Sequence, residues 1–275
     1  MPNVNELLKF IADHFKMPHN SAVVYARVAR EAGLLSQAGY GRAAARAVAD
    51  DAGALIIALV LSPSPARAAD YIRDFGGLVC TQVSLHKKGI EHKPFFDRGQ
   101  RFVDALSQLI AGLGDREFAM LVARQTLVYE PYEPSFVVQI CDSGLVSHIE
   151  IGGYETAIYQ HEIMYNTDWS KEQDEGQTPL IADALKQRNS AVAKYHRRFK
   201  SEKSLYNSSL FPIAEFLNGV SFEALYAAAL EDIKRETEGE APAPTVSPYP
   251  GIGSVVKDRP ATSDPHHRYE PPIEK

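Results

Sequence analysis

The hydrophobic positions at the amino end of the chain follow a helical period. Apolar residues there lie three or four positions apart, as on one face of an α-helix. The pattern predicts a first helix of about three turns, and Asn3 or Asn5 is placed to cap it. Its apolar face consists of Val4, Leu7, Leu8, Ile11 and Phe15.

A second helix is predicted after the break at residues 17–21, with Asn20 or Ser21 as its N-cap. Gly33 is predicted to end this helix by adopting the left-handed conformation. Helical spacing also assigns the two faces of this segment. Val23, Val24 and Val28 are predicted to face the core, and Arg27, Arg30 and Glu31 are predicted to face solvent.

Two more helices are predicted over residues 52–61 and 65–75, and Asp50 or Asp51 is placed to cap the first of them. The Ser-Pro-Ser-Pro sequence at 62–65 ends the first of these helices. Pro65 then begins the second, because proline suits the first position of a helix. Short helices joined by short connections indicate a compact helical head over residues 1–77.

The apolar period changes to two at about residue 136. Residues 136–140 and 146–151 are rich in β-branched side chains, and Asp142-Ser143-Gly144 lies between them. This arrangement predicts a β-hairpin, to which residues 154–165 add a third strand. Further helices are predicted over 102–113, 115–124, 180–203 and 211–235, the last with a break at Asn218-Gly219.

The predicted fold class is α+β. A helical head, residues 1–77, is followed by a linker, residues 78–97, which includes a short strand at 79–85. Residues 98–235 are predicted to form a second domain with a β-hairpin or small antiparallel sheet and helices. Residues 236–275 are rich in proline and poor in large apolar side chains, so this tail is predicted to be disordered.

Composition narrows the class of protein. The chain has 275 residues, 45% of them apolar, which is ordinary for a soluble globular protein. Its net charge of −6 argues against a protein that coats nucleic acid over its whole surface, but allows a local basic face. Cys80 and Cys141 are the only cysteines, too few for a disulfide scaffold or a zinc cluster. No membrane span or secretory signal is visible, so the bacterial or host-cell cytoplasm is the expected location.

Basic residues gather on and after the second predicted helix. Residues 16–46 contain five basic residues and one acidic residue, with a glycine-punctuated loop at 39–42. DNA binding requires cations that meet phosphates and a protruding element that fits a groove. The predicted DNA-contacting residues are Arg27, Arg30, Tyr40, Arg42 and Arg46.

The sequence YARVAREAGLL at 25–35, followed by Gly39-Tyr40-Gly41-Arg42, resembles winged helix-turn-helix DNA-binding heads. A longer pattern, from residues 30–34 through 55–59 to Ser62-Pro63, is similar to a poorly characterised group of proteins encoded in proteobacterial phages and prophages. The resemblance covers about residues 1–76 and implies a winged-helix-like head. By analogy with phage proteins that have such heads, it implies a small terminase subunit or a regulator.

A second basic patch lies in the predicted helix at 180–203. Residues 186–203 contain seven basic residues and one acidic residue, and the centre of the patch is Lys194, Arg197, Arg198 and Lys200. Such a helix either follows a phosphate backbone or contacts an acidic partner, and the acidic residues at 168–175 offer a partner within the same molecule.

An enzymatic role has little support in the sequence. Phosphate-binding loops, dinucleotide-binding fingerprints, nucleophile elbows and His-Glu-x-x-His motifs are absent. Cys141, His148 and Glu150 lie on the predicted hairpin and leave a hydrolase or deaminase open as a third hypothesis. The Pro-Cys-x-x-Cys partner of the zinc deaminases is missing.

The sequence therefore predicts a DNA-binding protein that acts on double-stranded DNA in phage packaging or transcription regulation. It is expected to be non-enzymatic and to have no cofactor. A homo-oligomer is expected, because several basic heads on an acidic chain bind more tightly than one. The alternative is an interaction or assembly protein that binds no nucleic acid. In that case the head docks another protein, the basic helix around Arg197 is the charged contact, and the α+β domain or the tail recruits a partner.

Overall fold

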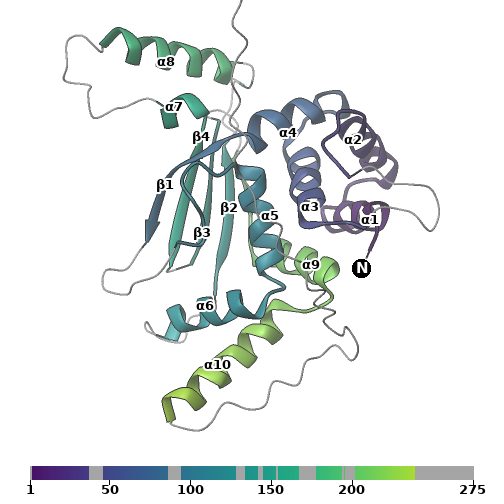
Figure 1. The fold of residues 1–275 in the computed structure, drawn as a ribbon. Coiled ribbons are helices and arrows are strands. Elements are labelled where there is room, and N and C mark those ends of the chain that lie inside the picture. The colour runs from purple at the N-terminus through teal and green to yellow at the C-terminus, as the bar shows by residue number, and fades with distance from the viewer. Residues whose placement is uncertain are drawn as a thin grey trace, which may run out of the picture. The chain divides into compact units, whose positions relative to one another are not determined.

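Five strands form one antiparallel sheet in the order β1-β4-β3-β2-β5 (Figure 1). The structure is a computed structural model that describes residues 2–36, 46–85, 94–127, 134–141, 145–152, 154–166, 178–193, 195 and 202–238. The strands are β1 (Val79–Leu85), β2 (Phe136–Cys141), β3 (Val146–Ile151), β4 (Glu155–Gln160) and β5 (Glu202–Leu205). The fold class is thus α+β, as predicted.

The predicted hairpin is confirmed by β2 and β3. Their register pairs Phe136 with Ile151 and Cys141 with Val146. Successive side chains of a strand point to opposite faces, so alternate residues of β2 are buried against the helices. The predicted third strand is β4, but it ends at Gln160, and a short helix, α7 (Glu162–Asn166), takes the place of its predicted second half.

The two edge strands come from segments that the sequence describes differently. β1 pairs with β4 and lies in the predicted linker at the position of the expected short strand. β5 pairs with β2, although residues up to 203 are predicted to be helical. Helix α8 (Thr178–Ala193) ends earlier than predicted. Leu205 of β5 is buried opposite Val138, so the open edge of β2 and the core beneath it favour a strand here.

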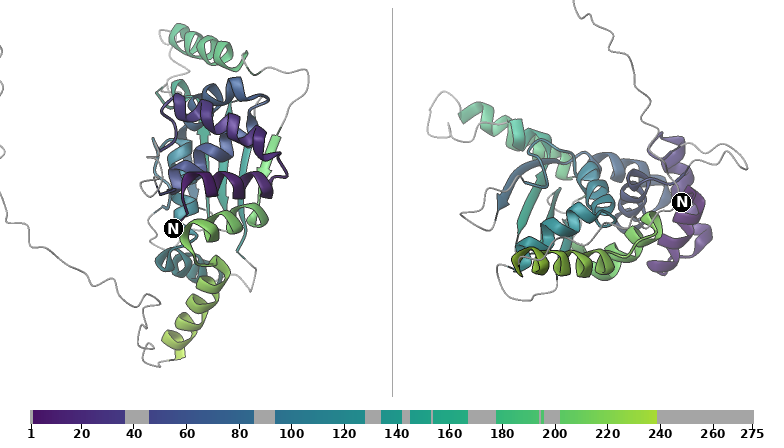
Figure 2. Two further views of the ribbon diagram at one scale, coloured as in Figure 1. Left: turned by 90° about the vertical axis from the view of Figure 1, so that its right-hand side faces the viewer. Right: turned by 60° about the horizontal axis from the view of Figure 1, so that its bottom comes forward.

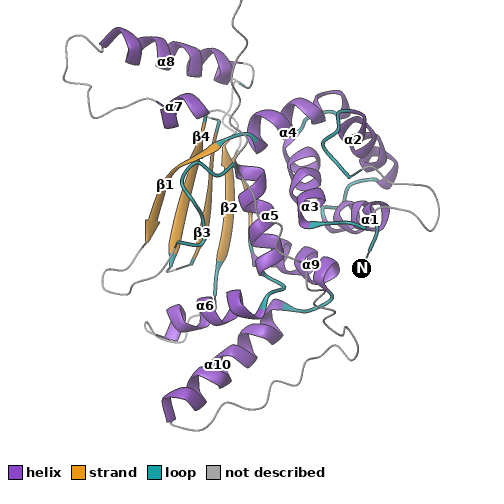
Figure 3. Ribbon diagram, viewed as in Figure 1, coloured by secondary structure: helices purple, strands orange, loops and turns teal. Residues whose placement is uncertain are grey.

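Helices cover one face of the sheet in successive layers (Figures 1 and 3). Helix α5 (Phe102–Gly112) lies nearest to the sheet, and the ring of Phe102 contacts Tyr159 of β4 at 5.3 Å between centroids. Helices α3 (Ala49–Ile56) and α4 (Ala68–Gly76) lie beyond it. Helices α1 (Val4–His14) and α2 (His19–Glu31) are outermost, as the left view of Figure 2 shows. A π-helical turn, Ile57–Leu61, extends α3 and completes the predicted apolar helix.

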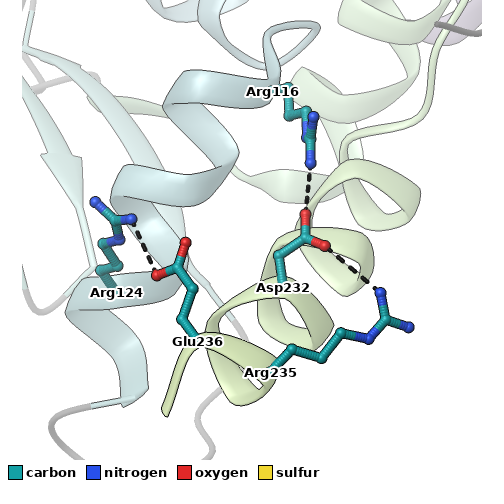
Figure 4. Close-up of polar contacts among 5 residues, drawn as sticks. All are labelled: Arg116, Arg124, Asp232, Arg235 and Glu236. Carbon is teal, nitrogen blue, oxygen red and sulfur yellow. Dashed lines mark hydrogen bonds and ion pairs between the residues drawn. The ribbon is translucent and has the colours of Figure 1, made fainter. Parts of the chain in front are cut away.

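Helices α6 (Arg116–Leu127) and α10 (Phe222–Glu238) pack side by side and are joined by ion pairs (Figure 4). Asp232 accepts a hydrogen bond from Arg116 at 2.6 Å and forms an ion pair with Arg235 at 3.8 Å. Arg124 and Glu236 form another pair at 3.3 Å. Because these pairs are largely solvent-exposed, they orient the helices more than they stabilise them.

Helix α9 (Asn207–Asn218) precedes α10, and the predicted break between them is confirmed. Gly219 has φ 72°, the left-handed conformation that ends many helices. Within the described part of the chain, no single helix is long and apolar enough to cross a membrane. Only α9 and α10 taken together, with a bend of 90° between them, reach such a length and composition.

The head and the sheet belong to one body. Residues Met1–Ala241 cluster into a single compact unit, whereas the sequence divides them into a head, a linker at 78–97 and a second domain. The reason is that helices of the head bury apolar surface against later elements. Phe10 of α1 stacks on Phe216 of α9 with ring centroids 4.3 Å apart. The predicted tail begins within α10, which continues to Glu238, and its remainder at 239–275 lies outside the described residues.

Candidate nucleic-acid interface

Helix α2 presents a different face to solvent from the one predicted. Its buried residues are Ala22, Tyr25, Ala26 and Ala29. Val23 and Val24 are 43% and 39% exposed, so their predicted inward orientation is wrong. The helix is apolar on two sides, and the alanine side allows close packing against α1, α4 and the turn at 65–67. Tyr25 fixes this orientation, since its hydroxyl donates a hydrogen bond to the Ser62 carbonyl at 3.2 Å.

Arg27 and Arg30 do not have equivalent surroundings. The Arg27 side chain is solvent-exposed and forms an ion pair with Glu31 at 3.5 Å on the same helix. Arg30 is half-buried and directed toward α1, where its Nη2 donates to Asn5 Oδ1 at 3.5 Å. Its Nε is buried without a hydrogen-bond partner. The exposed Arg27 side chain is therefore accessible to an external anion that competes with Glu31, whereas Arg30 mainly joins two helices.

Arg46 lies on the surface beside the amino end of α1. Its backbone forms an isolated antiparallel bridge with Asn3, and the next residue, Ala47, donates to the Pro2 carbonyl at 2.9 Å. Asn3 is also the N-cap of α1, as predicted, and accepts from the backbone of Asn5 and Glu6. In the described part of the head, residues 2–36 and 46–76, this bridge is the one β pairing that is present.

A buried carboxylate joins the two sides of the glycine-rich loop. Asp51, which is 2% exposed, accepts a hydrogen bond from Ser36 N at 2.7 Å and another from Val48 N at 3.1 Å. The second bond joins Asp51, the third residue of α3, to the backbone of the N-cap Val48, so the helix begins before the predicted N-cap residues Asp50 and Asp51. The first bond is a tertiary contact that helix signals do not reveal. Tyr40 and Arg42, two predicted contact residues, lie between these anchors but outside the described residues.

Charge is distributed unevenly over the head. Its described residues carry as many acidic as basic side chains, so the head as a whole does not attract a polyanion. Residues 14–30, however, contain Lys16, Arg27, Arg30 and two histidines, and they contain no acidic residue. The positive potential is thus concentrated on α2 and the turn before it, with Glu31 at its far end.

The second basic patch lies outside the described residues, because Lys194, Arg197, Arg198 and Lys200 are not among them. Tyr195, in the middle of that sequence, is described and is 2% exposed. Its ring contacts Tyr71 and Phe75 of α4 at 5.0 and 5.2 Å, and its hydroxyl donates a hydrogen bond to Asp74. Burial, followed by the bond to Asp74, raises the pKa of Tyr195. An aromatic residue within a basic sequence is a weak signal for such an anchor.

Replacing Tyr195 with phenylalanine is expected to lower the free energy of unfolding by about 1–2 kcal/mol, because the buried hydrogen bond to a carboxylate is lost while the ring remains. Urea denaturation measures the change. Tyr206, which is 52% exposed, provides the matched Tyr206→Phe control, for which we expect no measurable change. Equal stabilities of the two variants would contradict the proposed anchor.

The residues of the enzymatic hypothesis, Cys141, His148 and Glu150, lie on one face of the hairpin. Cys141 lies opposite Val146, whereas His148 lies opposite Gln139, two pairs further along the hairpin. His148 and Glu150 share the face of β3 away from the helices, as predicted. Among the described residues, no group of three or more His, Cys, Asp or Glu side chains could hold a metal ion.

Two features near the sheet were missed by the sequence interpretation. A half-open pocket of about 470 Å³ lies between α4, the start of β1 and α7, and its charged lining residues are Arg73, Asp74, Arg101, His161 and Glu162. Glu155, at the start of β4, is fully buried and accepts hydrogen bonds from Phe95 N at 2.7 Å and Phe96 N at 2.9 Å. An acidic residue at an inward position of an apolar strand was the available signal.

The comparisons with known proteins give no relative: no family model, curated protein or solved structure matches the chain. The relation to winged-helix and phage proteins therefore stays a prediction based on the motifs of the head.

Proposed function

We propose that the protein binds double-stranded DNA through the exposed side of α2. The observation that carries this proposal is the basic, acid-free sequence of residues 14–30, in which the Arg27 side chain projects into solvent with Glu31 as its ion-pair partner. The antiparallel bridge at Arg46 and the anchors of Asp51 support a winged-helix-like layout, in which the loop after α2 returns to the amino end of α1. Arg42 and Tyr40 belong to that loop and are proposed contacts.

The affinity of one head is modest in this proposal, because few cations are available to neutralise phosphates. A homo-oligomer that presents several heads compensates for this by avidity. On the basis of the head motifs, we propose that the protein is of phage or prophage origin, acts in DNA packaging or transcription regulation, and has no enzymatic activity or cofactor.

Replacing Arg27 with alanine is expected to weaken duplex binding several-fold and to reduce the slope of log K against log salt by about one, because one phosphate contact is lost. Glu31→Gln is expected to strengthen binding, because it removes the ion-pair partner of Arg27 and a negative charge at the interface. Fluorescence anisotropy with a labelled duplex at two salt concentrations measures both effects.

Arg235→Ala is the matched control, since Arg235 is also a helix residue that is ion-paired on the surface, but on α10. Arg30→Ala is expected to reduce stability with little change in the salt slope, because Arg30 contacts Asn5. If Arg27→Ala and Arg235→Ala bind duplex DNA equally well, the assignment of α2 as the DNA-binding surface is wrong.

A second candidate function is favoured by the exposed valines of α2. Val24 borders a shallow groove with Met17, Pro18 and Pro65, and an apolar surface of this kind suits a protein partner. In this alternative the head docks a protein and does not bind nucleic acid. The absence of any binding to duplex DNA at low salt would favour it over the first proposal.

A further inference from the structure

The exposed side of α2 carries an ordered stripe of four residues. Asn20, Val23, Val24 and Arg27 follow the spacing i, i+3, i+4 and i+7, which places them in line along one helix face. All four are exposed. Among the exposed large apolar residues of the described chain, Val23 and Val24 are the one adjacent pair; the others lie singly on different elements.

The stripe stays exposed, although Pro65 lines a shallow groove beside Asn20 and Val24. Helix α2 belongs to the outermost helical layer and contacts α1, α4 and the turn at 65–67, and its buried residues are Tyr25 and three alanines (Figure 2, left view). The stripe therefore combines an amide, two apolar side chains and a guanidinium. Lys16 and His19 precede it, and Glu31, the ion-pair partner of Arg27, follows it. Residues 14–30 hold three basic residues and no acidic one, which suits a polyanion, and the apolar centre of the stripe requires an apolar contact on that polyanion.

The major groove of DNA offers this combination. It is about as wide as an α-helix with its side chains, and the C5 methyl group of thymine is the apolar group that its base edges present. Residues in the amino-terminal half of a recognition helix contact base edges, and Val23 and Val24 lie at the fifth and sixth of the 13 positions of α2. Asparagine can form paired hydrogen bonds with adenine.

We infer that Val23 and Val24 contact thymine methyl groups in the major groove, so that the preferred partner is duplex DNA with A·T pairs at these positions. Asn20 lies one turn earlier and faces the adjacent base edge, while Arg27 lies one turn later and meets a phosphate. This inference rests on the proposed function and adds that the DNA sequence recognised contains A·T pairs.

The test compares two duplexes of about 30 base pairs, roughly three helical turns, one of alternating dA and dT and the other of alternating dA and dU. They differ in the C5 methyl group and share the same backbone and hydrogen-bonding groups. We expect the full-length protein to bind the thymine duplex more tightly, by about fourfold for each methyl group that is buried. Anisotropy competition gives the ratio directly.

The double variant Val23→Ala, Val24→Ala is expected to bind both duplexes with similar affinity. Leu85→Ala is the matched control, because Leu85 is a 38% exposed apolar residue on β1, outside the head. It should keep the full preference for thymine. Circular dichroism of each variant verifies that the helices remain folded.

The possible outcomes distinguish a failure of thymine recognition from a failure of DNA binding. Equal binding of the wild type to both duplexes would overturn thymine recognition while leaving DNA binding intact. A preference that persists in the double valine variant would also overturn it. No binding to either duplex at low salt would overturn both the inference and the proposed function, and the valine surface would then be assigned to a protein partner.

Discussion

Glu155→Ala is expected to lower the free energy of unfolding by about 2–4 kcal/mol. The substitution leaves the backbone N–H groups of Phe95 and Phe96 without their acceptor, and each buried unsatisfied donor costs about 1–3 kcal/mol. These two residues also place aromatic rings in the core, since Phe95 contacts Phe118 and Phe96 contacts Tyr159. Loss of the carboxylate therefore weakens the attachment of residues 94–101 to the sheet.

Urea denaturation measures the effect, and Glu150→Ala is the control. Glu150 lies on the opposite face of the neighbouring strand β3, where it is half-exposed. Its removal is expected to change stability by less than about 0.5 kcal/mol. If both variants lose the same amount of stability, Glu155 does not have the structural role assigned to it.

The same residue gives stability a defined pH dependence. Burial raises the pKa of Glu155, while the hydrogen bonds from Phe95 and Phe96 oppose the rise, and the nearby Asp97 adds to it. A carboxyl with a higher pKa in the folded than in the unfolded state favours folding most when it is protonated, below its unfolded pKa of about 4.3. This contribution is lost as the pH rises through the folded-state pKa.

Glu155→Gln removes this titration while keeping the shape of the side chain. The stability of the wild type relative to this variant should therefore fall as the pH is raised from about 4 toward neutrality. The neighbouring Cys80, Tyr154 and Tyr159, whose pKa values are also raised by burial, remain protonated over this range. Parallel stability curves for the two proteins would contradict the raised pKa.

Asp51→Ala is expected to have the second large effect, a loss of about 2–4 kcal/mol. It leaves the backbone N–H groups of Ser36 and of Val48, the N-cap of α3, without their charged acceptor. The effect should extend to function, because the segments that flank residues 37–45 are no longer fixed to one another. Duplex affinity is expected to fall even at temperatures where the variant is fully folded.

Asp50→Ala is the control for this prediction. Asp50 is the preceding residue in the same helical turn and is exposed, so both variants lose one negative charge from the amino end of α3. Thermal unfolding and duplex anisotropy are measured on both. A similar decrease in stability for Asp50→Ala would show that the loss arises from the charge at the helix end and not from the contact with Ser36.

Several elements could be predicted because their signals are local. Helix α1 combines apolar residues at helical spacing with a capping asparagine, so its neighbours within one turn specify it. Apolar residues at every second position of 136–151, interrupted by a turn sequence, specify the hairpin of β2 and β3. Gly33 and Gly219 have positive φ at helix ends, where glycine has no steric penalty.

Other features depend on partners that are distant in the sequence. Residues 202–205 become a strand because β2 offers an open edge, and local helical propensity is overridden. In α2, valines and alanines form apolar faces on two sides, and only packing against α1 and α4 decides which one is buried. The roles of Arg27 and Arg30 follow from that choice.

The sequence by itself thus determined the α+β class, the elements with strong local periods, and the concentration of basic residues around α2. Tertiary structure decided the order of the strands, the union of head and sheet in one body, and the side of α2 that reaches solvent. Hydrophobic periodicity records how residues within one element are spaced, whereas burial depends on the complementary shape of elements that meet only after folding. The exposure of Val23 and Val24, on which the proposed contact to thymine depends, was decided by this packing between elements.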